Sequence, residues 1–186
     1  MGPSSGDRRT SPLERRQASR KPSTGTARTA ANGFRCGSRG PRVTLYLDTS
    51  SLVKLYVDEP DSDTVRKLVA SAAIVSTATI AYIETRAALA RRRRERALRP
   101  AALASAKKTF EAEWPRYFSI EVTSALCREA GAFAERYRLR AYDSVHLAAF
   151  AEIARAAGVR ETEFSSFDNA LNRAASALRR SLIRTH

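Results

Sequence analysis

The sequence contains only two cysteines, Cys36 and Cys127, among its 186 residues. Two thiols cannot hold a structural zinc ion by themselves. Cys36 lies in a stretch with few large apolar residues, which argues against a structural disulfide. Such sparing use of cysteine is typical of proteins in a reducing compartment. We therefore expect a cytoplasmic protein that does not depend on disulfides.

Long hydrophobic runs are also missing. No apolar stretch approaches the roughly 20 residues that a membrane-spanning helix needs. The N-terminal arginines are not followed by the apolar segment of a secretory signal. We therefore expect no membrane partner.

Acidic residues are scarce relative to basic ones. There are 33 Lys and Arg against 19 Asp and Glu, which gives a formal net charge of +14. The first 41 residues hold nine of the basic and two of the acidic residues, which leaves 24 basic and 17 acidic residues, a net charge of +7, for the remainder. A cationic domain favours a polyanionic partner, although a general effect of charge on solubility explains the excess equally well.

The composition divides the chain into a tail and a domain. Residues 1–41 are rich in Ser, Gly, Pro, Thr and Arg and have few large apolar side chains, so we predict a disordered basic extension. Apolar residues make up 43% of the whole chain, enough for a normal core. We expect a folded domain over residues 42–180 and a flexible end over 181–186.

Short β-rich apolar runs alternate with helical patterns along the domain. We predict strands at 43–47, 72–77, 117–122 and 161–166. Helical spacing predicts helices at 50–59, 61–71, 79–96, 100–115, 124–137, 142–157 and 167–178. In the helix that starts at Thr79, we expect Ile80, Ile83, Ala87, Leu89 and Ala90 to face the core. Alternation of this kind predicts an α/β fold with a mostly parallel sheet.

Four acids occupy positions linked to the ends of these elements. Asp48 directly follows the first strand, and Asp168 follows the fourth. Glu84 lies in the first turns of the helix after the second strand, and Asp143 begins a helix. Ligands of an open parallel sheet bind beyond the carboxyl ends of its strands, so these acids are expected to share one pocket. Crowded carboxylates repel each other unless a hard cation such as Mg²⁺ neutralises them, and such a cluster suits phosphodiester hydrolysis.

Each acid also has an ordinary structural explanation. Asp48, Asp143 and Asp168 are favoured helix-capping residues, and Glu84 is placed to pair with Arg91 or another arginine. Taken singly, these signals are weak. Their joint arrangement is far more specific.

Four stretches, in this order, carry a family resemblance: LYLDTSSLVKLY, IAYIETRAALA, LRAYDSVHLAAFA and EFSSFDNALNRAA. They resemble the PIN-domain ribonucleases, and within these the VapC-like toxins of type II toxin–antitoxin modules. The resemblance covers about residues 43–178. It implies a PIN-like three-layer α/β/α sandwich whose central, mostly parallel sheet has about four to five strands.

The resemblance also implies roles for particular residues and partners. Asp48, Glu84, Asp143 and Asp168 match the family's acids, which bind Mg²⁺ or Mn²⁺, and Ser50 matches a Ser or Thr that helps to arrange the metal site. The family further implies an endoribonuclease that cuts tRNA, rRNA or mRNA, a homodimer, and a cognate antitoxin that covers the site.

Further residues near these motifs have two explanations each. The run RRRRER places Arg91, Arg92, Arg93 and Arg94 where they either contact RNA phosphates or form a solvated helix end. Four adjacent helical residues point in different directions, so not all of them can face one groove. His146 either supports a metal ligand or is an ordinary partly buried histidine, and we do not expect it to bind metal.

Two other functions are compatible with parts of the sequence. A phosphohydrolase would use Asp48 as a covalent nucleophile, but such enzymes usually need a second Asp two residues later, where this chain has Ser50. A non-catalytic RNA-binding or antitoxin-docking module would have lost its metal ligands, whereas all four acids are present here.

Overall fold

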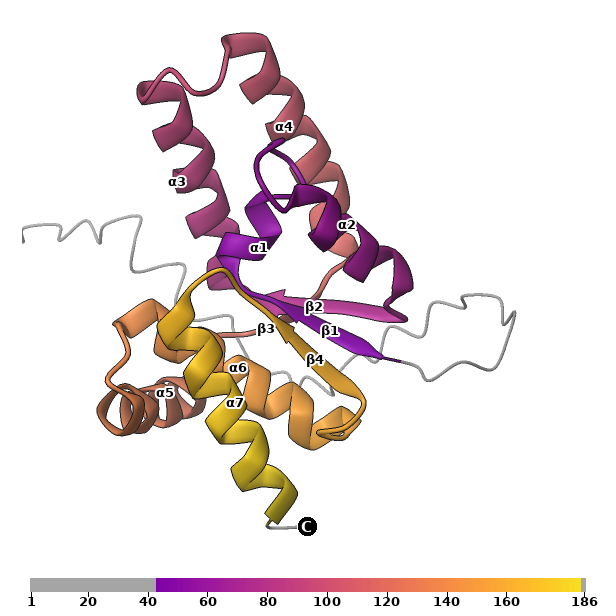
Figure 1. Ribbon diagram of the computed structural model, residues 1–186. Coiled ribbons are helices and arrows are strands. Elements are labelled where there is room, and N and C mark those ends of the chain that lie inside the picture. Colours follow the sequence, from indigo (N-terminus) through magenta and orange to yellow (C-terminus); the bar gives the residue numbers. More distant parts are fainter. Residues whose placement is uncertain (1–42, 185–186) are drawn as a thin grey trace, which may run out of the picture. The chain divides into compact units, whose positions relative to one another are not determined.

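The computed structural model describes residues 43–184. The predictions for the extension at 1–41 and for the last two residues lie outside this range. Four parallel strands form one sheet in the order β3-β2-β1-β4 (Figure 1). The strands are β1 (Thr44–Leu47), β2 (Ile74–Ala78), β3 (Phe118–Ile120) and β4 (Thr162–Ser165). The pairing of Leu47 with Ser165 aligns the carboxyl ends of β1 and β4.

Helices cover both faces of this sheet. The chain order is α1 (Thr49–Val53), α2 (Ser62–Ser71), α3 (Ile80–Arg94), α4 (Pro100–Glu113), a 3-10 turn η2 (Trp114–Arg116), α5 (Ser124–Tyr137), α6 (Ala141–Ala157) and α7 (Asn169–Arg184). Helices α1 to α4 lie on one side of the sheet, and α5 to α7 lie on the other (Figure 1). The predicted α/β/α sandwich with a parallel sheet is therefore confirmed.

The side chains of β1 point alternately to the two faces of the sheet and contribute to a hydrophobic core on each face. Leu45 and Leu47 point toward a core that includes Phe110 of α4. Tyr46 points to the opposite face, into the larger core built on α6. Successive strand side chains point to opposite faces, so a strand buried on both sides is mostly apolar, as β1 is apart from Thr44.

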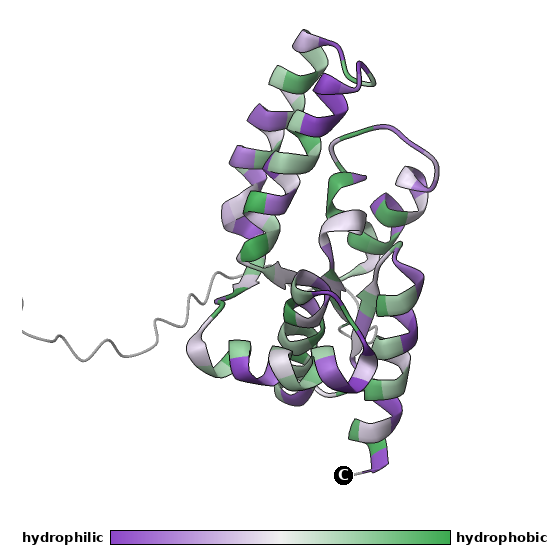
Figure 2. Ribbon diagram, turned by 90° about the vertical axis from the view of Figure 1, so that its left-hand side faces the viewer, coloured by the Kyte–Doolittle hydropathy of each residue, from purple (hydrophilic) through white to green (hydrophobic). Residues whose placement is uncertain are grey.

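The α3–α4 hairpin extends beyond the sheet, and hydrophobic and hydrophilic residues alternate along it (Figure 2). The side of α3 that packs agrees with our expectation at Leu89 but not at Ile83 or Ala87. Ala81, Thr85 and Leu89 are buried, whereas Ile83 is 69% exposed. An alanine-rich helix carries apolar residues on several sides, so hydrophobicity alone does not decide which side packs.

Two helix boundaries also differ from those predicted. Helix α1 ends at Val53, and residues 54–56 form turns in which the backbone hydrogen bonds reach back three residues, as from Leu55 N–H to the Leu52 carbonyl. Helix α7 continues to Arg184, so residues 181–184 are helical and not a loose end. Over residues 43–184, none of the helices is long and apolar enough to cross a membrane.

Candidate functional site

A cleft of about 710 Å³ lies beyond the carboxyl ends of β1 and β4. All four predicted acids and Ser50 line it, and they come from separate parts of the fold. Asp48 joins β1 to α1, Glu84 belongs to α3, Asp143 lies in the first turn of α6, and Asp168 precedes α7. The parallel sheet thus brings together acids that are far apart in the sequence.

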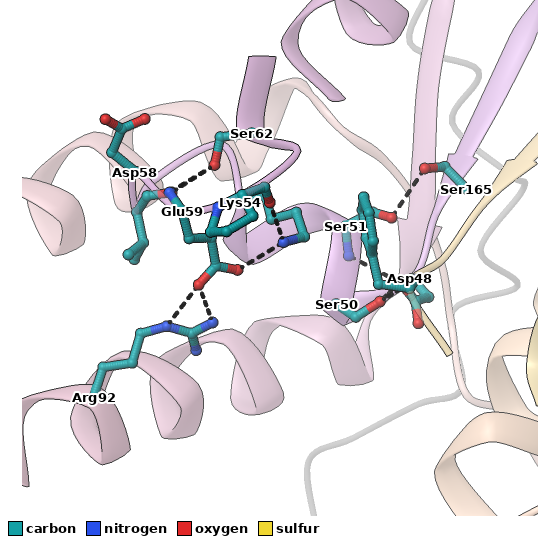
Figure 3. A network of polar contacts seen from close by, with 12 residues as sticks. Asp48, Ser50, Ser51, Lys54, Asp58, Glu59, Ser62, Arg92 and Ser165 are labelled. Atoms are coloured by element: carbon teal, nitrogen blue, oxygen red, sulfur yellow. Dashed lines mark hydrogen bonds and ion pairs between the residues drawn. The ribbon is translucent and has the colours of Figure 1, made fainter. Parts of the chain in front are cut away.

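Asp48 is 5% exposed, and its carboxylate accepts three hydrogen bonds. Oδ1 accepts from Ser50 Oγ at 2.7 Å and from the Ser51 backbone N–H at 3.0 Å (Figure 3), and Oδ2 accepts from Ser166 Oγ at 2.8 Å. The bond to Ser51 caps α1, so the capping explanation holds alongside the placement in the cleft. Burial raises the pKa of Asp48 above its ordinary value, although His146 and these hydrogen bonds oppose the shift.

Asp143 and Asp168 add negative charge to the same cleft. Burial, and then the charge of Asp168, raises the pKa of Asp143, with a smaller contribution from Asp48. Asp168 Oδ1 also accepts from the Leu171 backbone N–H at 2.8 Å, which caps the start of α7. The raised pKa values indicate carboxylate charge that the surrounding protein does not fully compensate.

Glu84 lies in a different environment. Its Oε2 accepts from Thr49 Oγ1 at 2.5 Å and lies 2.8 Å from Nε2 of His146. Burial alone would raise the pKa of Glu84, but the hydrogen bonds from His146 and Thr49 outweigh it and lower the pKa. Glu84 therefore differs from Asp48 and Asp143, because its surroundings favour the ionised form.

A buried hydrogen-bond chain extends from Glu84 through His146 to Tyr46. Nδ1 of His146 lies 2.9 Å from the hydroxyl of Tyr46, and both residues are almost completely buried. Burial raises the pKa of Tyr46 well above its ordinary value, so its hydroxyl stays protonated. The carboxylate of Glu84 can only accept, so Nε2 of His146 carries a proton, and Nδ1 of the neutral ring accepts from the Tyr46 hydroxyl. The Nε2–H of His146 then donates to Glu84. The arrangement fixes the ring and supports one carboxylate oxygen.

The sequence alone revealed little of this hydrogen-bond network. It left open a supporting role for His146 and assigned none to Tyr46 or Thr49. One signal was present: Tyr46 lies in a fully buried strand, and a buried tyrosine hydroxyl usually needs a hydrogen-bond partner. The spacing of 100 residues between Tyr46 and His146 hid that partner.

Basic side chains form the rim of the cleft. Arg91, Arg92 and Arg94 line it, whereas Arg93 does not. Arg92 donates to Glu59 Oε2 at 2.6 and 3.2 Å, and Lys54 donates to Glu59 Oε1 at 3.1 Å (Figure 3). Burial would raise the pKa of Glu59, but these two cations together lower it. Glu59 therefore holds two rim cations in fixed positions.

The donor atoms of the cleft fit a hard divalent cation. Carboxylate and hydroxyl oxygens are the ligands that Mg²⁺ and Mn²⁺ prefer. Among residues 43–184, no group of three or more His, Cys, Asp or Glu side chains is arranged to hold a metal ion. Mg²⁺ commonly needs only one or two carboxylates and completes its shell with water. The uncompensated charge on Asp48 and Asp143 is of the kind that a cation relieves.

Comparison with known proteins agrees with this geometry. The PIN domain family model matches residues 45–177, which include all four acids. Ribonuclease VapC45 of Mycobacterium tuberculosis (strain CDC 1551 / Oshkosh) is 35% identical over 104 residues, which cover 56% of this chain and 72% of that protein. Ribonuclease VapC49 of Mycobacterium tuberculosis (strain ATCC 25618 / H37Rv) matches with the same identity and coverage. The resemblance predicted from the four sequence stretches is thereby confirmed, and the chain belongs to the PIN-domain family.

Proposed function

We propose that this chain is the toxin of a type II toxin–antitoxin pair, an endoribonuclease that hydrolyses RNA phosphodiester bonds in the cleft. The observation that carries the proposal is the convergence of Asp48, Glu84, Asp143 and Asp168 on one cleft. The similarity to two ribonucleases supports the choice of substrate. We further propose that the protein acts in the cytoplasm on tRNA, rRNA or mRNA.

The four acids would hold Mg²⁺ or Mn²⁺. When bound, such a cation would neutralise the carboxylates and supply an activated water for attack on the phosphate. Ser50 fixes the orientation of Asp48 through the bond from its Oγ to Oδ1. His146 and Thr49 orient Glu84, and Tyr46 orients His146 in turn. Outer partners of this kind set the position and basicity of metal ligands.

Arginines on the rim would contact RNA phosphates. The contribution of the run from Arg91 to Arg94 is uneven, because Arg93 lies outside the lining of the cleft. Arg140, the residue that precedes α6, also lines the cleft. Arginine pairs with phosphate through a planar group with several donors, so this rim suits a polyanion.

We also propose a cognate antitoxin and a homodimer as partners. Ile83 and Val122 are exposed and help to line an apolar groove of about 500 Å³ beside α3 and β3. Exposed apolar patches of this kind often mark protein contacts. The groove shares no lining residue with the cleft, so a protein contact there would leave the cleft residues available.

The alternative use of Asp48 as a covalent nucleophile has less support. Both of its carboxylate oxygens accept hydrogen bonds, and the residue is 5% exposed. Enzymes with an aspartate nucleophile usually carry a second Asp two residues later, where this chain has Ser50, whose Oγ donates to Asp48. The observed arrangement suits a fixed ligand better.

Replacing Asp48 by Asn tests the proposed chemistry. We expect the purified variant to lose cleavage of labelled RNA by about 100-fold or more, since it alters a ligand and not only an outer partner. EDTA should abolish cleavage by the unmodified chain, and Mg²⁺ or Mn²⁺ should restore it. Asp58→Asn is the matched control, because the Asp58 side chain is 90% exposed. Cleavage that persists in EDTA would refute the metal-dependent function.

Replacing His146 separates its positioning role from simple packing. His146→Leu removes the Nε2–H that donates to Glu84 and should weaken Mn²⁺ binding by about 10–100-fold. His146→Gln keeps an N–H donor and should retain most of the affinity. Calorimetric titration with Mn²⁺ measures both, and circular dichroism checks that the variants are folded. A folded Leu variant with unchanged affinity would contradict the role.

Asp143→Asn should stabilise the metal-free chain. The pKa of Asp143 is raised in the folded state, so its ionised form destabilises the fold at pH 7, and this effect is relieved as pH falls through the raised pKa. We expect Tm to rise by about 1–3 °C at pH 7 and the difference from the unmodified chain to shrink toward pH 4. Thermal melts in EDTA across this range provide the measurement. A difference that does not change with pH would exclude charge repulsion as its cause.

Arg94→Ala and Arg93→Ala form a matched pair for the RNA rim. Both remove one charge from α3, but only Arg94 lines the cleft. We expect Arg94→Ala to weaken RNA binding and to reduce the salt dependence of log K by about 0.7, the value for one phosphate contact on a single strand. Fluorescence anisotropy in EDTA at several salt concentrations measures this without cleavage. Equal effects from both variants would point to a diffuse charge effect.

A further inference from the structure

Two aromatic side chains remain exposed inside the cleft. Tyr142 is 58% exposed and Phe167 is 41% exposed, and both line the cleft. Each immediately precedes one of the acids, Asp143 and Asp168. Neither ring belongs to the three hydrophobic cores, in which most other aromatic residues over 43–184 pack. Exposed rings beside the acids suit a ligand that has a flat apolar face.

The ring of Phe167 is held at a fixed place relative to Asp48. The backbone N–H of Phe167 donates to Ser50 Oγ at 2.7 Å, and the same Oγ donates to Asp48. The ammonium of Lys54 lies 4.3 Å from the ring centroid and is itself held by Glu59. A ring that is already positioned loses little conformational freedom when a ligand stacks on it.

The remaining surface of the cleft defines that ligand. Arginines supply a rim that suits phosphates, and the acids lie next to each ring in the sequence. A polyanion that also presents flat ring faces is a nucleic acid strand whose bases are unpaired. Aromatic side chains stack on such bases with little dependence on sequence.

We propose that Tyr142 and Phe167 form a stacking platform for unpaired bases on either side of the phosphate that faces the acids. The proposal rests on the proposed function and adds a requirement to it. In an A-form duplex the bases are stacked on each other inside the helix, so they cannot reach the rings. The cleft then selects unpaired nucleotides by stacking and not by reading base edges.

The test uses the full chain and a short RNA that contains 2-aminopurine, either alone or annealed to its complement. Phe167→Leu and Tyr142→Leu keep an apolar side chain but remove the ring. We expect each to weaken binding of the single strand in EDTA by about 5- to 150-fold, which corresponds to the loss of one base stack. Quenching of 2-aminopurine fluorescence on binding should be lost, and duplex binding should not change.

Phe118→Leu is the matched control, because Phe118 is 56% exposed but does not line the cleft. It should bind and cleave like the unmodified chain. A parallel measurement of kcat/KM with Mn²⁺ should show the same loss in the Tyr142 and Phe167 variants for unpaired RNA.

Two outcomes separate this proposal from the function on which it rests. If both Leu variants bind and cleave unpaired RNA like the unmodified chain, the platform is overturned and the ribonuclease proposal stands. If the unmodified chain neither binds nor cleaves RNA, the proposed function fails, and the platform fails with it.

Discussion

The buried carboxylate of Asp48 connects several parts of this fold. It caps α1 through the Ser51 backbone, and it accepts a hydrogen bond from Ser166, which lies 118 residues away after β4. One group therefore joins the end of β1, the first helix and the loop at the neighbouring strand. A buried carboxylate is costly unless it is well hydrogen-bonded. Its raised pKa shows that three hydrogen bonds reduce this cost but do not remove it.

The acids of the cleft are not equivalent. Burial raises the pKa values of Asp48 and Asp143, and repulsion from Asp168 and Asp48 adds to the rise at Asp143, whereas donors from His146 and Thr49 lower the pKa of Glu84. The protein thus compensates the charge of Glu84 internally and leaves those of Asp48 and Asp143 to be compensated from outside. A cluster that the protein had neutralised completely would have little affinity for a cation. The incomplete compensation is what the proposed function requires.

The sequence predicts the layout of the fold better than its details. Buried strands that are followed directly by acids, as at Asp48, predict the sheet and the position of the cleft, because parallel strands end at the same edge. Contacts between distant residues escape such reasoning, as with Tyr46 and His146. The exposure of Ile83 escapes it too, since packing of α3 against α4 decides the phase of an alanine-rich helix. The same phase determines that Arg93 does not line the cleft.

The rim and the floor of the cleft carry opposite charges, and this contrast constrains how a phosphate can enter. The arginines of α3 attract a polyanion, and Glu59 fixes Arg92 and Lys54 so that they keep their positions. A phosphate drawn past this rim then meets the carboxylates of Asp48 and Asp143, which repel it. A divalent cation would neutralise this charge and relieve the repulsion, as the proposed phosphodiester chemistry requires.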